Sequence, residues 1–200
     1  MGRRSDHSRE ELYAMALVAA QAIAEEEGLR GLSARRITRE IGYTIGTFYS
    51  LFDNFDDLVL RLNGTTLDAL YEDCAAAPLD GEPEAALHRL AARYIGFTRA
   101  HAKRWRILFE HRLPDGEVQP DWYREKIFRL LGLVETALMP LFPPGQEVER
   151  LHEARVLWSS LHGICSLECV DKLVSTETVE ALSDSLITNY LVGLRTETEK

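Results

Sequence analysis

The segment that decides the fold is residues 32–51, which read LSARRITREIGYTIGTFYSL. Ser33 can cap a first short helix by accepting a hydrogen bond from a backbone N–H that the helix leaves unpaired. Gly42 follows that helix where its C-terminal end needs a residue that tolerates positive φ, and Thr44 can then cap a second short helix. The pattern therefore predicts two short helices joined by a tight turn, which is the arrangement of a helix-turn-helix.

The apolar residues of this segment predict how the two helices pack. Ile37 and Ile41 are four residues apart and share one face of the first helix, and Phe48 and Leu51 of the second helix are expected to point back toward them. In a helix-turn-helix the second helix presents its N-terminal residues to the major groove of DNA. Here those residues are small or slender enough for close approach: Thr44, Ile45, Gly46 and Thr47. Two helices that serve only core packing would show a similar pattern.

The charge distribution favours DNA binding by this segment. Residues 30–39 carry no acid and four arginines, namely Arg30, Arg35, Arg36 and Arg39. Residues 1–52 contain seven Lys or Arg and seven Asp or Glu, so the remainder of the chain carries the whole net charge of −9. An arginine cluster in an acidic protein suggests a face adapted to phosphate, because counterion release by such residues supplies most non-specific DNA affinity. A solvated helix face is the alternative.

Residues 8–68 resemble the DNA-binding domain of the TetR/AcrR family of bacterial transcriptional regulators. The matching residues are Gly28, 31–33 (GLS), Arg36, Ile37, 42–49 (GYTIGTFY), Phe52, Asn54, Asp57 and Leu58. A second, smaller match is 157–163 (LWSSLHG), which resembles the Trp…His-Gly signature of one group of TetR C-terminal domains.

The resemblance implies an all-α fold of about nine helices, with a three-helix DNA-binding head at 8–68 and a ligand-binding and dimerisation domain at 69–200. It implies a homodimeric repressor that a small-molecule effector releases from a palindromic operator. Phosphate contacts are expected from Ser33, Arg35 and Arg36. Contacts to bases or nearby backbone are expected from Thr44, Ile45, Gly46, Thr47 and Tyr49.

The sequence departs from the family pattern just after the second short helix. The family often has a histidine before the phenylalanine that matches Phe52 and a lysine shortly after it, whereas this chain has Leu51 and Phe55. Acidic residues crowd the same turn, at Asp53, Asp56 and Asp57, and they would repel DNA. We therefore expect fewer phosphate contacts than is typical. The departures also support an alternative, a helical small-molecule-binding or enzymatic protein with a vestigial DNA-binding head.

Helical periodicity extends over most of the chain. A first amphipathic helix, ended by Gly28, is expected to close the head, and a fourth runs from Asp53 or Asn54 to about Ala76. Further helices are predicted around Leu87–Phe97, Trp105–Phe109, Ile127–Leu138, Gln146–Leu173 and Thr178–Leu194. The last two are the expected dimer surface, with apolar stripes at Leu151, Leu161, Leu182, Leu186 and Tyr190, which could also be buried inside a monomer.

Aromatic and polar residues on the C-terminal helices are the candidates for an effector pocket, because such pockets are mainly apolar with a few orienting polar groups. The candidates are Tyr94, Phe97, Trp105, Phe109, Phe128, Trp158 and His162. An aromatic core stripe without a cavity would use the same residues. A second basic run, residues 99–112, could be a nucleic-acid patch, but its spacing fits a short amphipathic helix with a solvated basic face better.

No catalytic, cofactor or metal site is expected. His162, Cys165 and Cys169 lie on one straight helix, where three ligands converge poorly on a zinc ion, and the sequence contains no G-x-S-x-G nucleophile motif. The chain has 46% hydrophobic residues but no apolar run long enough to span a bilayer. Three cysteines and the absence of a secretory signal after Met1 lead us to expect a cytoplasmic protein.

Overall fold

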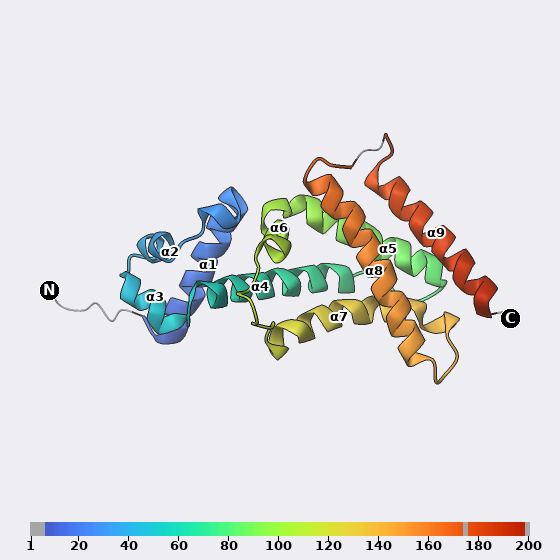
Figure 1. The fold of residues 1–200 in the computed structure, drawn as a ribbon, viewed down its shortest axis with the longest axis horizontal. Coiled ribbons are helices and arrows are strands. Elements are labelled where there is room, and N and C mark those ends of the chain that lie inside the picture. The colour runs from blue at the N-terminus through green and yellow to red at the C-terminus, as the bar shows by residue number, and fades with distance from the viewer. Residues whose placement is uncertain (1–6, 174–175, 199–200) are drawn as a thin grey trace. The chain divides into compact units, whose positions relative to one another are not determined.

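The structure, a computed structural model, describes residues 7–173 and 176–198. Over these residues the chain forms nine α-helices and two short 3₁₀ helices, and no strand (Figure 1). The helices are α1 Arg9–Glu27, α2 Ala34–Glu40, α3 Ile45–Leu51, α4 Phe55–Ala75, α5 Pro83–Ala100, α6 Ala102–Glu110, α7 Asp121–Leu138, α8 Glu147–Cys169 and α9 Val179–Thr198. The 3₁₀ helices are η1 Leu29–Gly31 and η2 Met139–Leu141. The all-α class is confirmed.

The chain divides into two compact units that are not consecutive in sequence. The first comprises residues up to Thr66 together with His101–Gln119, and the second comprises Leu67–Ala100 together with the residues from Pro120 onward. Helix α4 begins in the first unit and ends in the second. The sequence places a domain boundary after residue 68, between a part that binds DNA and a part that binds the effector. This functional division stays a prediction. By packing, α6 belongs with the N-terminal helices.

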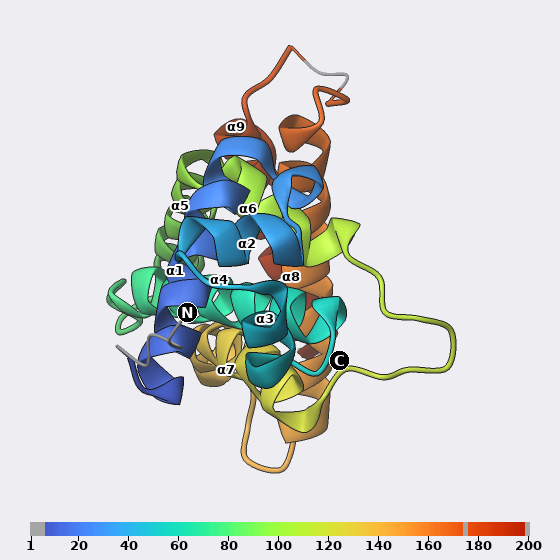
Figure 2. The ribbon, with the colours of Figure 1, turned by 90° about the vertical axis from the view of Figure 1, so that its left-hand side faces the viewer.

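The first unit has a compact apolar core. Helix α1 starts with a capping box in which the Ser8 side chain accepts from the backbone N–H of Glu11 while the Glu11 carboxylate accepts from that of Ser8. Its small residues around Ala20 pack with Ile37 of α2 and Phe48 of α3. Figure 2 shows this unit from the side on which α2 and α3 lie next to each other. The expected three-helix head is present.

Helix α6 completes the first unit and corrects one expectation. Ile107 is fully buried in the core of the head. Arg104, expected on a solvated basic face, has only 5% of its surface exposed, and it donates from Nε to Thr66 Oγ1 at 2.7 Å and from Nη2 to Thr65 Oγ1 at 3.2 Å. Because burial disfavours the charged form, the pKa of Arg104 is lowered. The basic run is therefore partly structural.

The second unit consists of α5, α7, α8 and α9, which pack against one another, and the end of α4. Helix α8 ends at Cys169, four residues before the expected Leu173, because Asp171 adopts a φ of 52°. Asp171 N–H then bonds to the carbonyl of Glu168, and Lys172 N–H bonds to that of Leu167 at 2.9 Å. This is a Schellman ending, with aspartate where glycine is usual.

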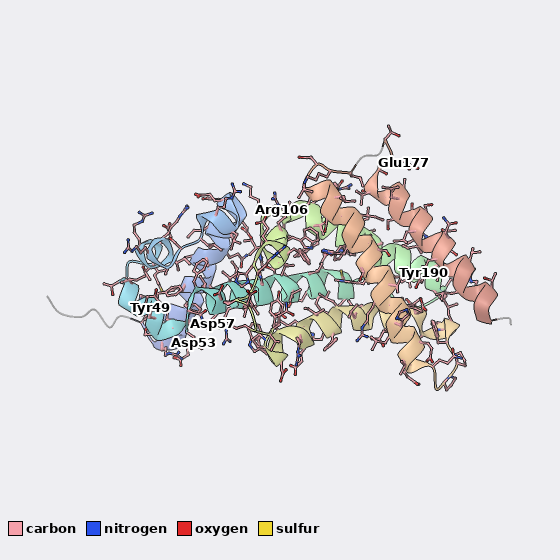
Figure 3. All side chains as sticks on the ribbon, in the orientation of Figure 1. Tyr49, Asp53, Asp57, Arg106, Glu177 and Tyr190 are labelled. Carbon is pink, nitrogen blue, oxygen red and sulfur yellow. The ribbon has the colours of Figure 1, made fainter. Side chains whose placement is uncertain are left out.

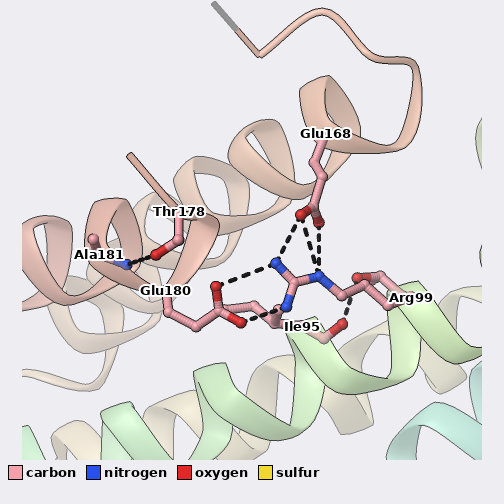
Figure 4. A network of polar contacts seen from close by, with 7 residues as sticks. Ile95, Arg99, Glu168, Thr178, Glu180 and Ala181 are labelled. Carbon is pink, nitrogen blue, oxygen red and sulfur yellow. Dashed lines mark hydrogen bonds and ion pairs between the residues drawn. The ribbon is translucent and has the colours of Figure 1, made fainter. Parts of the chain in front are cut away.

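One arginine ties three helices of this unit together. The guanidinium of Arg99, at the end of α5, donates from Nη2 to Glu168 of α8 at 2.7 Å and from Nη1 to Glu180 of α9 (Figure 4). The hydrogen bonds to both carboxylates raise the pKa of Arg99. Thr178 caps α9 beside this network, accepting from Ala181 N–H at 3.2 Å. The C-terminal end of α8 and the N-terminal end of α9 are thereby held on α5.

Candidate DNA-binding surface and effector cavity

The segment from α2 to α3 has the geometry of a helix-turn-helix. Ser33 Oγ accepts a hydrogen bond from the backbone N–H of Arg36 at 3.2 Å, so the predicted cap of α2 is confirmed. Gly42 adopts a φ of 78° in the turn, a conformation that glycine tolerates best. Thr44 precedes α3 as expected, but within the described chain its side chain does not cap that helix. Its carbonyl instead accepts from Thr47 N–H at 2.9 Å.

Helix α3 turns one face to the core and the other to solvent. Phe48 and Leu51 are buried, which matches their expected packing. Tyr49 is 64% exposed and Ile45 is 40% exposed, and Figure 3 labels Tyr49 on this helix. Thr44 and Gly46 are also exposed, and Thr47 is half-buried. The residues expected to approach DNA therefore lie together on an accessible surface of the first unit.

The arginines beside this surface differ in their exposure and in their contacts. Arg35 is exposed on α2. Arg36 is half-buried, and its two terminal nitrogens each bond to a carboxylate oxygen of Glu27, both at 2.6 Å. These hydrogen bonds lower the pKa of Glu27. Because Arg36 forms a bidentate ion pair with Glu27 of α1, a DNA phosphate would have to share Arg36 with Glu27 or replace Glu27.

Two of the acidic residues at the start of α4 have partners among their neighbours. Asp57 Oδ1 accepts from Arg61 Nε at 2.9 Å, and Asp56 Oδ1 lies 2.8 Å from Nε2 of His111. Phe55, found where the family often has a basic residue, packs against the core of the head. Figure 3 labels Asp53 and Asp57 at this turn. Two of the three carboxylates that support the vestigial-head alternative thus have partners inside the unit.

Two family models match most of the chain. The model of tetR-family bacterial regulatory proteins matches residues 16–62. The model of the tetracyclin repressor-like C-terminal domain matches residues 87–190, which is more than half of the chain. The chain belongs to the TetR family. The resemblance seen in residues 8–68 and 157–163 is confirmed, and the protein is a DNA-binding transcriptional regulator. The family and the fold are those of a regulator rather than of an enzyme.

Solved structures share the TetR-like fold. A protein of unknown function from Rhodococcus sp. RHA1 has a TM-score of 0.74 at 20% identity, over 96% of this chain and 98% of that one. A TetR transcriptional regulator from Rhodococcus sp. RHA1 has a TM-score of 0.69 at 15% identity, over 92% and 98% of the two chains. The multidrug binding protein EbrR, complexed with imidazole, has a TM-score of 0.64 at 22% identity, over 90% and 94%. No curated protein matches the chain.

The second unit of this TetR-family chain contains an apolar cavity of about 40 Å³. Helices α5, α7, α8 and α9 line it, with Cys74 at the end of α4. Tyr94 of α5 and Trp158 of α8 meet at its wall with their ring centroids 5.0 Å apart. His162 lies behind Tyr94, with Nδ1 2.8 Å from the tyrosine hydroxyl. The cavity is the candidate effector site.

The structure brings together some of the expected effector residues and separates others. Tyr94, Trp158 and His162 gather at the cavity. Phe97 is buried but outside the lining. Trp105 and Phe109 lie on α6, which belongs to the first unit, and Phe128 is 53% exposed on α7. These last three residues are not part of the cavity. The prediction missed this because an aromatic stripe in the sequence does not show which unit, or which face of a helix, its residues join.

Sequence reasoning missed most of the lining. The wall is largely aliphatic, with leucines such as Leu90, Leu130 and Leu157. A leucine at a helical spacing indicates burial but does not distinguish a filled core from a cavity, so the sequence held no signal for them.

No helix of the described residues is both long and apolar enough to cross a membrane.

Proposed function

We propose that this TetR-family regulator is a homodimeric cytoplasmic repressor that a small-molecule effector releases from a palindromic operator. The observation that carries the proposal is the exposed face of α3, where small side chains and Tyr49 stand clear of the core. In a two-fold dimer two such helices would enter successive major grooves, about 34–36 Å apart, which is why the operator would be palindromic.

The proposed contacts divide into two classes. Ser33, Arg35 and Arg36 lie at the start of α2 and would hold the DNA backbone; Ser33 and Arg35 are exposed and Arg36 is half-buried. The residues of α3 would contact bases or nearby backbone, namely Thr44, Ile45, Gly46, Thr47 and Tyr49. Phosphate contacts fix the register of a protein on the duplex, whereas base contacts determine the sequence it selects.

The proposed dimer surface is the outer face of α8 and α9. On α8 this face carries Ser159, Gly163 and Leu167, with Val170 directly after the helix, and on α9 it carries Ala181, Ser185 and Val192, all at helical spacing. Leu167 and Val192 are 45% and 54% exposed in the single chain. Small residues let helices approach closely and pack as a four-helix bundle. Leu161 and Leu186, also expected on this surface, line the cavity.

The size of the cavity supports release by an effector. Ligand sites usually measure about 300–1,000 Å³, whereas this cavity measures about 40 Å³. An effector of ordinary size would therefore have to part the surrounding helices to be accommodated in full. Such a ligand favours the parted state over the closed one, and this difference in affinity is what allows it to shift a conformational equilibrium.

The proposal is tested by gel shift with the DNA upstream of the protein's own gene. We expect the wild-type protein to select a specific fragment over a scrambled one and the T47R/Y49A double variant to lose that selection, because both changes alter the exposed face of α3. A V18A variant, changed at an exposed residue of α1, should bind as the wild type does. Equal, weak binding of both fragments by the wild type and the double variant would contradict the proposal.

The salt dependence of operator binding should be shallower than a large set of phosphate contacts would give. Arg36 is already bound to Glu27, Phe55 replaces a basic residue, and Asp53 lies exposed at the same turn. Each phosphate contact contributes about −0.9 to the slope of log K against log salt concentration. We expect a slope shallower than about −8 per dimer, measured by fluorescence anisotropy. A steeper slope would contradict the expectation that this protein makes few phosphate contacts.

A further inference from the structure

The wall of the cavity has no charged side chain. Its thirteen lining residues include no Asp, Glu, Lys, Arg or His. Its only side chains with a polar atom are those of Tyr94, Trp158 and Cys74. The lining comes from five helices, α4, α5, α7, α8 and α9. Among the described residues, none of these helices contributes a charged side chain to the wall.

Cys74 at the wall and His162 behind it are both neutral near physiological pH. Burial raises the pKa of the Cys74 thiol to about 12, so it stays protonated. Burial lowers the pKa of His162 behind the wall. The imidazole lies between two hydroxyls, with Nδ1 2.8 Å from Tyr94 Oη and Nε2 3.1 Å from Ser166 Oγ. A neutral imidazole, which donates from one nitrogen and accepts at the other, satisfies both contacts.

A charged ligand would therefore meet no counter-charge in this cavity. Burying an ion without a partner is strongly unfavourable, whereas an apolar molecule gains free energy when its surface leaves water. Apolar cavities stay dry and accept apolar guests. We propose that the effector is an uncharged, apolar molecule, and that carboxylates and organic cations are excluded. This inference rests on the proposed function, which places the effector in this cavity.

Three probes with the same carbon chain and different charges test the proposal on the full-length protein. They are 1-octanol, octanoate and octylammonium, and the measurement is isothermal titration calorimetry near neutral pH. We expect octanol to bind and each ion to bind at least about thirtyfold more weakly, because only the ions carry a buried charge. Octanoate or octylammonium binding within threefold of octanol would overturn the proposal, as would no detectable binding of octanol up to its solubility limit.

A variant of the wall provides a second measurement. Leu133 lines the cavity on α7 and is half-buried, so L133E should place a carboxylate there, and we expect octylammonium to become the tightest of the three probes. Phe128 lies on the same helix, is exposed and does not line the cavity, so F128E should keep the wild-type order. An unchanged order in folded L133E would contradict the assignment of the ligand to this cavity.

Failure of this inference can be told apart from failure of the proposed function. A charged probe that binds tightly and releases the operator would overturn the neutral-ligand inference and leave effector-controlled repression standing. Octanol that binds tightly while the operator stays bound would support the chemistry of the cavity and contradict release by its occupant. Anisotropy of labelled operator DNA, recorded during the same titrations, distinguishes these two results.

Discussion

Replacing Gly46 by glutamate is expected to lower operator affinity by about 100-fold or more at physiological salt. Gly46 is exposed in the first turn of α3, and a Cβ added there would meet only Thr44 Oγ1, at 3.7 Å. The folded head can therefore accept the new side chain. Glutamate also favours a helix more than glycine does and suits its N-terminal end. The loss should thus come from repulsion between two carboxylates, one in each head, and the phosphates. Fluorescence anisotropy measures the affinity, and thermal unfolding measures the stability.

The matched control is the same substitution on another helix. Gly96 is exposed on α5, and a Cβ added there would meet nothing within 4 Å. Because G96E changes the net charge by the same amount, it separates a local effect from a general change in charge. G96E should bind the operator within about threefold of the wild type. If G46E did the same, α3 would not be the helix that enters the DNA groove.

Replacing Gly163 by arginine is expected to convert the dimer to a monomer at concentrations where the wild type is fully dimeric. Gly163 lies on the outer face of α8, and a Cβ added there would meet nothing within 4 Å in the single chain. In a two-fold interface the two arginines would be brought close together, and a buried, unpaired charge is costly. Operator affinity should fall by about 100-fold or more, because each head would then bind alone. Sedimentation velocity and anisotropy measure the two effects.

Gly132 of α7 provides the control for this change. It is also half-buried in a helix with open space beside it, but it lies outside α8 and α9. The G132R variant should remain dimeric and bind the operator normally. A G163R protein that stays dimeric would show that the subunits associate through another surface.

The sequence predicted the helices well where local signals were strong. The periodic apolar residues of α1, α4 and α7 identified all three, and Ser33 identified the start of α2. The predicted end of α8 was wrong by four residues. The sequence has no glycine there, and Asp171 adopts the left-handed conformation that ends the helix. Thr44 was placed correctly before α3, but a side-chain hydrogen bond depends on a rotamer that composition does not reveal.

The two sites differed in how far the sequence could predict them. Residues exposed on α3 follow from local periodicity, since Phe48 and Leu51 identify the buried face. The cavity depends on where distant helices meet, and its aliphatic wall has no distinctive residue type. The sequence did not reveal that α6 packs in the head for a similar reason, because Arg104 looks solvated in the sequence and its partner Thr66 is 38 residues away.

The burial of Arg104 has a mechanical consequence. The guanidinium of Arg104, with 5% of its surface exposed, depends on its partners Thr65, Thr66 and Glu25, because leaving a buried charge without its ionic partner costs about 3–5 kcal/mol. Helix α6 therefore cannot slide away from Thr65 and Thr66 of α4 on its own. Within the first unit, α6 and the part of α4 around Thr65 and Thr66 are consequently expected to move as one piece.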